Sequence, residues 1–440
     1  MKNKVLKDSL VIGFAQFAIF FGAGNLVFPP MIGLATGEHV VSGLVGMTLA
    51  GILLPMMAVW AIGNMGTDIY DITAPVTKWW RHFYIILSIP IVCLGTIPRC
   101  GGVAYEIGLL GIFPSLPAWS KWAFLIVFFG LAYYFANNKS KVIDRIGTYI
   151  TPILLITLLI VLLLAVFNPL GKPSGGFVDN PFSYALLQSY NTGDVGTGLV
   201  CTGIVLAAIQ NHGYTEEKER KKMLFNTIVV SFIILFVVYG GLCLLGSTGT
   251  GLFTSDIDNT ALLVGLVTRV AGYGGIVILA LAIIFACFTT ATGMIAVASD
   301  WIVTLWVKDR VPYKLIALIL TLVMFFTASL DVNNVINISG PLFILIYPMA
   351  ITLTLLGCFT KWVPNNGVWK GSVFVATAFG MYDALAAARA NGLLSLATPG
   401  LDGIMSSIPL ASIGLAWFIP TVIGGIAGGI IYKAVVKKEQ

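Results

Sequence analysis

The chain has 440 residues, of which 58% are hydrophobic and only 10% are charged, and its formal net charge is +6. Soluble domains carry about 25% charged residues, so a water-soluble fold could not bury this much apolar surface. Lipid admits only helices and closed barrels, because every backbone polar group must be satisfied within the hydrocarbon. The apolar runs are continuous, as in 150–166 and 228–245, whereas barrel strands alternate with a period of two. The composition therefore predicts an all-α membrane protein.

Twelve membrane-spanning helices are expected, at about 9–34, 39–64, 82–112, 120–137, 145–168, 183–211, 223–247, 273–305, 313–330, 335–358, 371–389 and 409–434. With the N terminus in the cytoplasm, 20 of the 25 Lys and Arg residues fall on the cytoplasmic side, four fall outside and Arg99 lies within a span. This asymmetry follows the positive-inside rule, so both termini are expected in the cytoplasm. The basic excess then faces anionic lipid headgroups, and nucleic acid is not expected as a partner.

The first expected span contains an internal weak point. Two glycines in the motif Gly22-Ala23-Gly24-Asn25 weaken a helix at mid-membrane. Pro29 and Pro30 lack N–H donors and restrict the preceding backbone, so they are expected to help unwind the span. An unwound stretch would leave N–H and C=O groups that lipid cannot satisfy but that a bound ion or substrate can. Close packing of helices through small residues explains the same glycines.

Three ionisable residues lie inside expected spans. Arg99 and Glu106 are seven residues apart in the third span, and Asp194 belongs to the sixth. Such residues are costly in the membrane and are functional candidates. They form a candidate charge network in which Asp194 pairs with Arg99 across helices. A structural ion pair or snorkelling side chains explain the same residues.

The sixth expected span gathers Gly and Thr residues on both sides of Asp194, from Tyr190 to Gly203. Spans 1 and 6 correspond if the first ten spans form two five-helix repeats, at about 9–168 and 183–358, followed by two extra helices at about 371–434. Transporters built on inverted repeats place their discontinuous helices in this way. The sequence therefore predicts one transmembrane domain over 1–440 with helices 1 and 6 discontinuous.

The eighth expected span carries a polar face. Ala286, Thr289 and Thr290 are spaced i, i+3, i+4 and so share one side of a helix. Their hydroxyl and carbonyl oxygens suit a small hard cation. Thr hydroxyls that bond back to the preceding turn explain the same pattern.

The positions of the cysteines and of the last glycines give further predictions. The six cysteines are scattered through apolar segments without C-x-x-C spacing, so we expect buried thiols and no metal site. The external stretch 258–270 is expected to form a surface helix. Overlapping G-x-x-x-G patterns in the last span predict close helix contact, either at a dimer face or within the chain, so a monomer or a weak homodimer is expected; the glycines are Gly424, Gly425, Gly428 and Gly429.

The first-span motif resembles the first-helix signature of the bacterial branched-chain amino acid:cation symporters, the BrnQ family; it reads Phe20-Phe21-Gly22-Ala23-Gly24-Asn25-Leu26-Val27-Phe28-Pro29-Pro30. Two further motifs resemble the third and eighth helices of that family; they are Ile97-Pro98-Arg99 with Tyr105-Glu106-Ile107-Gly108, and Cys287-Phe288-Thr289-Thr290-Ala291-Thr292-Gly293. The resemblance covers nearly the whole chain and implies a LeuT-type fold with a five-plus-five inverted repeat.

The resemblance also implies roles for individual residues. Amides of Gly22, Ala23 and Gly24 would meet the substrate carboxylate, and Asn25 would contact the substrate or a second sodium ion. The substrate side of the sixth helix would be lined by Cys201, Thr202 and Gly203. A sodium site would be formed by the carbonyls of Ala18, Phe21 and Ala286 and by the hydroxyls of Thr289 and Thr290.

The expected function is sodium-coupled uptake of leucine, isoleucine and valine by alternating access, across a bacterial inner membrane and without a resident cofactor. Proton coupling, or another small amino acid as substrate, remains the alternative. A channel would need a continuous polar lining, whereas the polar groups here gather at mid-depth. A membrane enzyme is not expected, because no nucleophile–base pair or His, Cys and carboxylate cluster is evident.

Overall fold

The computed structural model describes residues 2–138, 141–307, 310–396 and 398–439, and within these residues every regular element is a helix. The α-helices are α1 (Lys2–Phe20), α2 (Ala23–Thr36), α3 (Val40–Thr48), α4 (Leu54–Met65), α5 (Ile69–Thr73), α6 (Trp80–Ile91), α7 (Ile97–Val103), α8 (Leu110–Ile112), α9 (Trp119–Asn138), α10 (Lys141–Phe167), α11 (Pro181–Tyr190), α12 (Asp194–Asn211), α13 (Glu217–Ser247), α14 (Asn259–Ile302), α15 (Tyr313–Ala328), α16 (Val332–Cys358), α17 (Asn366–Ala390), α18 (Pro399–Ser406) and α19 (Phe418–Glu439). The all-α prediction is confirmed.

Shorter helical turns join or interrupt these elements. The π-helical segments are η2 (Leu49–Leu53), η3 (Val92–Thr96), η4 (Ala104–Leu109) and η5 (Val303–Val307), and the 3₁₀ turns are η1 (Gly37–His39), η6 (Thr360–Trp362) and η7 (Ala411–Ile413). The π segments η3 and η4 flank α7, so the third expected span is one continuous helix of mixed type from Trp80 to Ile112.

Nine helical stretches among the described residues are long and apolar enough to cross a membrane. Two of them, Ala23–Met65 and Asn259–Val307, contain 43 and 49 residues, although about 20 suffice for one crossing. The backbone turns inside each, at Gly37 with φ 51° and at Gly272 with φ 65°. The turn at Gly272 lies within α14, where it separates the expected surface helix from the eighth span. The count of twelve crossings stays a prediction.

Proline does not end α2, the helix that begins directly after Gly22. Pro29 and Pro30 lie inside α2, which continues to Thr36. The expectation that they help to unwind the first span is therefore wrong for their own positions. Proline removes a hydrogen-bond donor but its fixed φ is compatible with a helix, and membrane helices tolerate it where neighbours pack around the freed carbonyls.

Small residues let several backbones touch. At Gly33 of α2, an added Cβ would lie 1.8 Å from the carbonyl oxygen of Cys243 in α13. At Gly246 of α13, it would lie 2.0 Å from the carbonyl oxygen of Pro30. Lipid provides no hydrophobic force between helices, so such close backbone contact is a main source of cohesion. The α2 helix is thereby fixed against α13.

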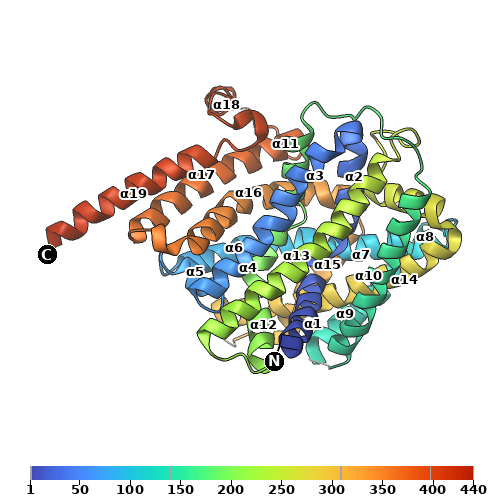
Figure 1. Ribbon diagram of the computed structural model, residues 1–440, viewed down its shortest axis with the longest axis horizontal. Helices are drawn as coiled ribbons and strands as arrows, with labels where there is room; N and C mark the ends of the chain where they lie inside the picture. Colours follow the sequence, from blue (N-terminus) through green and yellow to red (C-terminus); the bar gives the residue numbers. More distant parts are fainter. Residues whose placement is uncertain (1, 139–140, 308–309, 397, 440) are drawn as a thin grey trace.

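The C-terminal pair α17 and α19 lies side by side and projects from the rest of the molecule (Figure 1). Glycines meet across this pair: a Cβ at Gly371 would lie 2.0 Å from the carbonyl oxygen of Gly424, and a Cβ at Gly428 would lie 2.3 Å from that of Gly367. The predicted glycine contact therefore forms within the chain. Ile426 and Ile430 of α19 are 60% and 66% exposed, as expected for side chains that face lipid.

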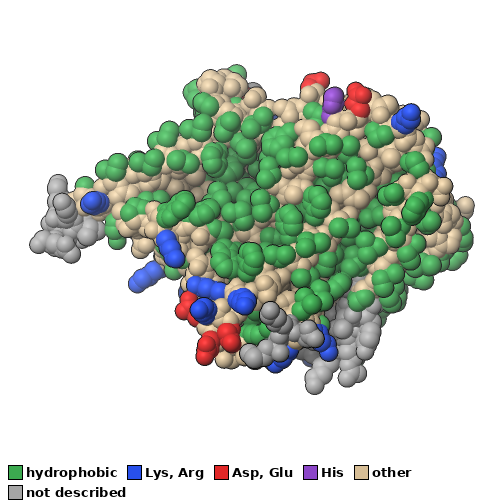
Figure 2. Space-filling model, viewed as in Figure 1, with side chains coloured by type: hydrophobic (Ala, Val, Ile, Leu, Met, Phe, Trp, Pro, Cys, Tyr) green, Lys and Arg blue, Asp and Glu red, His purple; other side chains and the backbone are tan. Residues whose placement is uncertain are grey.

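The surface matches a membrane-embedded body. Figure 2 shows hydrophobic side chains across the middle of this face, while Lys, Arg, Asp and Glu side chains lie mainly toward its upper and lower ends. The N terminus lies at the lower end (Figure 1). Lys139 and Lys308, which the positive-inside argument places on the inner side, lie outside the described residues.

Candidate functional site

Two interruptions of helical geometry face one another in the interior. Between α1 and α2 the backbone is extended at Gly22, with φ −120° and ψ −169°. Between α11 and α12 it turns through 191–193, where Gly193 is left-handed with φ 78°. A Cβ at Gly24 would lie 3.6 Å from the Cα atom of Thr192, so the two interruptions are adjacent. Glycine is needed at Gly193 because side chains rarely adopt that φ.

A buried polar cluster occupies the space between these interruptions. The Asp194 carboxylate begins α12 and is 2% exposed, and the Asn25 amide of α2 is 1% exposed. The Asn25 Nδ2 atom donates to Asp194 Oδ1 and Oδ2 at 3.2 and 3.1 Å. The hydroxyl of Tyr239, from α13, donates to Asp194 Oδ2 at 3.1 Å. Asp194 is thus held by side chains from two other helices.

The Asn25 amide nitrogen has more acceptors than it can satisfy. Besides the two carboxylate oxygens, it lies 2.6 Å from the Phe20 carbonyl oxygen at the end of α1, and it contacts the Tyr239 hydroxyl. An amide nitrogen carries only two N–H groups. Four oxygens therefore converge on one position, which is the arrangement that a hard cation requires.

Arg99 supports the second interruption from the opposite side. Its side chain is buried, and its Nη1 atom donates to the Asn191 carbonyl oxygen at 2.6 Å. Its Nε atom donates to the Gly95 carbonyl oxygen, and its guanidinium lies 4.5 Å from the ring centroid of Phe343. In the described part of the chain no Lys or Arg lies within ion-pair distance of Asp194. Arg99 therefore holds the turn at 191–193 instead of forming the predicted ion pair.

A small cavity of about 70 Å³ adjoins the second interruption. Typical ligand pockets measure about 300–1,000 Å³, so a substrate requires the lining to move apart. The cavity is bordered by η3, α12, α14 and α16, and its lining includes Val92, Gly193, Thr197, Val200, Cys201, Met294, Phe343 and Tyr347. It also reaches Tyr84 and Trp301, which lie at the N-terminal end of α6 and the C-terminal end of α14.

The structure places the three residues predicted for the sixth helix differently from one another. Cys201 lines the cavity. Thr202 is buried, and its hydroxyl donates to the Gly198 carbonyl oxygen of the preceding turn. A Cβ at Gly203 would lie 3.1 Å from the Thr67 carbonyl oxygen, outside the cavity lining. The cavity face of α12 lies closer to its start than expected.

The residues predicted for the carboxylate lie at the first interruption. Gly22 is partly exposed, and a Cβ there would meet no atom within 4 Å. Ala23 and Gly24 begin α2, and the first N–H groups of a helix have no partner within it. The Cys100 thiol contacts the Ala23 amide and the Cys287 thiol, whereas the sequence predicted only buried hydrophobes at both cysteines. The Ala23 amide is thus contacted by the Cys100 thiol, and open space remains beside Gly22.

The predicted sodium ligands divide into two groups. Ala18 and Phe21 flank the end of α1, which packs chiefly on α13 and α12. Thr289 and Thr290 are partly exposed on α14, and the Thr289 hydroxyl donates to the Ala286 carbonyl oxygen at 2.9 Å. A Cβ at Gly293, one turn on, would meet no atom within 4 Å. The α14 face is open, and the Thr289 hydroxyl is held by its own helix.

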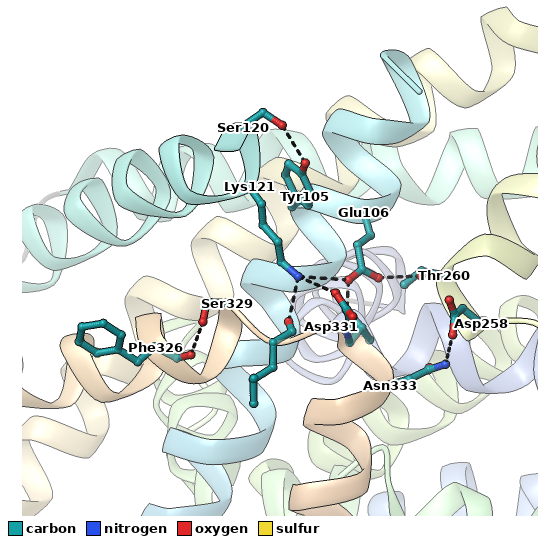
Figure 3. A network of polar contacts seen from close by, with 12 residues as sticks. Tyr105, Glu106, Ser120, Lys121, Asp258, Thr260, Phe326, Ser329, Asp331 and Asn333 are labelled. Atoms are coloured by element: carbon teal, nitrogen blue, oxygen red, sulfur yellow. Dashed lines mark hydrogen bonds and ion pairs between the residues drawn. The ribbon is translucent and has the colours of Figure 1, made fainter. Parts of the chain in front are cut away.

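Glu106 belongs to a separate polar network with Thr260 and Lys121 (Figure 3). Its Oε2 atom accepts from the Thr260 hydroxyl at 2.7 Å, and its Oε1 atom accepts from the Val332 amide at 3.1 Å. Lys121 lies 4.0 Å from Glu106 and 2.9 Å from Asp331. The network joins η4, α9 and the first turns of α14 and α16, so the three predicted ionisable residues do not form one network.

Replacing Glu106 by Ala is expected to lower the free energy of unfolding by about 1.5–3 kcal/mol, the range for hydrogen bonds to a charged group. The reason is that both Thr260 and the first amide of α16 lose their acceptor. Thermal unfolding of the purified protein in detergent measures the effect. Glu106→Gln, which keeps one acceptor oxygen, should lose less. Glu217→Ala at an exposed surface pair serves as control, and an equal loss there would contradict the assignment.

The sequence of this chain matches a known protein family over nearly its whole length. A sequence profile described as "Branched-chain amino acid transport protein" matches residues 5–435. The chain belongs to the branched-chain amino acid transport protein family. It is 31% identical to the branched-chain amino acid permease BraB of Bacillus subtilis, over 98% of this chain and 97% of the relative. It is 31% identical to the branched-chain amino acid transport system 2 carrier protein of Pseudomonas aeruginosa, over 94% of each.

This chain shares its fold with distant transporters of known structure. The inward-facing conformation of Mhp1 aligns with a TM-score of 0.61 at 13% identity, over 97% of this chain and 91% of that one. A Na⁺-coupled sialic acid symporter aligns with a TM-score of 0.57 at 13% identity, over 96% and 90%. The LeuT-type fold predicted from the sequence is confirmed. The named relatives are permeases and carriers, so the family is one of transporters and not of enzymes.

Proposed function

We propose that this protein imports leucine, isoleucine and valine across a bacterial inner membrane by alternating access, in symport with a cation that is most simply sodium. Relatives named for branched-chain amino acids match the chain from end to end, which supports the substrate class. The polar cluster at Asp194 supports cation coupling, because it joins both helix interruptions and carries an acidic group that no basic side chain pairs with among the described residues.

The cluster at Asp194 is the first proposed cation site. If the Asn25 amide rotates, its Oδ1 atom joins the Phe20 carbonyl, the Asp194 carboxylate and the Tyr239 hydroxyl in a set of oxygen ligands. Such ligands suit sodium, and the negative charge of Asp194 supplies the neutralisation. The same carboxylate is the group that would carry a proton if protons drive transport.

The second proposed cation site uses the open face of α14. Thr289, Thr290 and the Ala286 carbonyl lie on that face, and the Ala18 and Phe21 carbonyls would complete the set when α1 approaches α14. In the present arrangement α1 packs on α13 and α12, so completion of this site requires α1 to move. A cation at this site would therefore favour one conformation of the transporter over another.

The amino acid is proposed to bind between the two interruptions. Its carboxylate meets the amides of Gly22, Ala23 and Gly24, where a positive helix end and open space coincide. Its aliphatic chain enters the cavity beside Val92, Val200 and Phe343. A cation that stabilises the interrupted backbone raises the affinity for substrate, and by linkage the substrate raises the affinity for the cation equally.

Uptake into proteoliposomes tests the proposal. Radiolabelled leucine should enter faster when sodium replaces choline outside, at fixed pH and membrane potential, and unlabelled isoleucine and valine should compete. Stimulation by a proton gradient without any effect of sodium would replace sodium by protons in the proposal. Absence of saturable, counterflow-competent leucine transport under both conditions would refute it.

Replacing Thr289 and Thr290 together by Ala should raise the sodium concentration for half-maximal uptake by about tenfold, since two oxygen ligands of about five are lost. The order of competition among leucine, isoleucine and valine should stay the same, because neither residue lines the cavity. Sodium titration of uptake measures the effect, with Thr327→Ala, at a partly exposed position of α15, as the control. A change of substrate order with unchanged sodium dependence would contradict the assignment.

A further inference from the structure

A second and larger cavity, of about 330 Å³, is lined in part by Leu187 and Tyr190 of α11, and we call it the outer cavity. Its walls come from α11, α16, α17, α18 and the segment that leads to α19. Its volume falls within the range of about 300–1,000 Å³ that is typical of ligand pockets. The proposed transport path does not use it, since the two cavities share no lining residue.

Asp383 of α17 is the distinctive group of this outer cavity. Its side chain is half-buried. Within the described ranges of the chain, no residue donates a hydrogen bond to Asp383 and no Lys or Arg pairs with it. A carboxylate partly withdrawn from water without a partner is costly. A bound cation would remove that cost.

The other acid of the cavity is already neutralised. Asp402 of α18 accepts from Arg389 Nη2 at 2.7 Å and from Arg389 Nη1 at 3.0 Å, and the Tyr382 hydroxyl donates to it at 2.6 Å. The Arg389 guanidinium holds the pKa of Asp402 well below its usual range. Arg389 is fully engaged and does not line the cavity, so Asp383 is the acid left for a ligand.

Apart from Ser406, the remaining lining is apolar or aromatic. Leu187, Ile344 and Met405 offer aliphatic contacts, and none of the described Lys or Arg residues lines the cavity. A carboxylate-bearing ligand would find no cationic partner there. We infer that the outer cavity binds an alkylammonium cation that lacks a carboxylate, with its ammonium on Asp383 and its chain among Leu187, Ile344 and Met405.

An occupant of this cavity would touch the second helix interruption. Tyr190 lines the outer cavity and is the last residue of α11, directly before the turn at 191–193. Its ring stacks on that of Tyr347, with centroids 4.3 Å apart, and Tyr347 lines the central cavity. The stacked pair therefore joins the lining of the outer cavity to that of the central cavity. An alkylammonium ion bound at Asp383 would therefore restrain the turn without entering the central cavity.

Calorimetry with 3-methylbutylamine as the probe tests the binding directly on the purified full chain. Binding to the unmodified protein and at least tenfold weaker binding to Asp383→Asn are expected, whereas Asp256→Asn, in an exposed loop, should bind as the unmodified protein does. Ser406→Trp, which fills the cavity from its rim, should also abolish binding, and Ser407→Trp beside it should not. No binding, or equal binding to Asp383→Asn, would overturn the inference.

A second measurement separates this site from the proposed transport site and rests on the proposed function. In proteoliposomes the amine should lower the maximal rate of leucine uptake without raising the half-saturating leucine concentration, and Asp383→Asn should remove that inhibition. Purely competitive inhibition would place the amine in the central cavity and overturn the inference. If leucine is not transported at all, the proposed function fails while the calorimetric result still decides the outer site.

Discussion

Asp194→Asn should reduce cation-stimulated leucine uptake by about 10- to 100-fold. The carboxylate accepts hydrogen bonds from Asn25 and Tyr239 and supplies the negative charge of the proposed first cation site. Hydrogen bonds to a charged group are worth about 1.5–3 kcal/mol, and about 1.4 kcal/mol corresponds to tenfold. An amide of the same size also brings its own N–H groups toward the Asn25 nitrogen. Initial uptake rates at saturating sodium measure the effect.

The same variant distinguishes two roles of Asp194. If it binds the coupling cation, both net uptake and leucine exchange should fall, because the substrate site is stabilised by that cation. If it only carries a proton, exchange should survive while uptake driven by a proton gradient is lost. Asp256→Asn provides the matched control for a change of one charge. Full sodium-stimulated uptake by Asp194→Asn would remove Asp194 from the mechanism.

Two substitutions of glycine by alanine should have opposite consequences for folding. Gly33→Ala places a methyl group 1.8 Å from the Cys243 carbonyl oxygen in α13, so folded protein should be lost or destabilised by about 1–3 kcal/mol or more. Gly22→Ala meets no atom within 4 Å and keeps an ordinary backbone conformation, so folding should persist. Leucine uptake should still fall at least about tenfold, because the methyl group occupies the space proposed for the substrate carboxylate.

Size-exclusion profiles and thermal unfolding report folding, and uptake normalised to folded protein reports function. Gly130→Ala, another glycine with no atom within 4 Å, should change neither and so serves as the control. Normal uptake by well-folded Gly22→Ala would show that Gly22 serves only packing. This comparison therefore separates the two explanations that the sequence left open for the first-span glycines.

Both helix interruptions could be located from the sequence, because they depend on local backbone chemistry. Glycine in the left-handed conformation at Gly193 and the extended Gly22 mark the ends of helices directly. The prolines misled the prediction, since Pro29 and Pro30 fit inside α2 once α13 packs against it. A residue's effect on its own helix is a local property, whereas the tolerance of a missing hydrogen bond depends on the surrounding helices.

The partners within the site depend on packing and could not be read from spacing. Asn25 and Asp194 were both candidates, but their contact spans 169 residues of sequence. Tyr239 was missed, although a phenol followed by Gly240 in an apolar span was a usable signal. Arg99 was expected to meet Asp194 and instead donates to the Asn191 carbonyl. Which face of α12 borders the cavity is set by its neighbours α4 and α16.

The glycine contact between α17 and α19 has a consequence for reading genetic screens. Backbone atoms meet so closely that any side chain at Gly371 or Gly428 would collide with the facing helix. Every missense change at these codons introduces such a side chain, so a saturation screen should return a cluster of inactive alleles in α17 and α19. Neither helix borders the central cavity or carries a ligand of the two proposed coupling-cation sites. Loss of function there would report failed assembly, and abundance measured beside activity would separate such alleles from true transport defects.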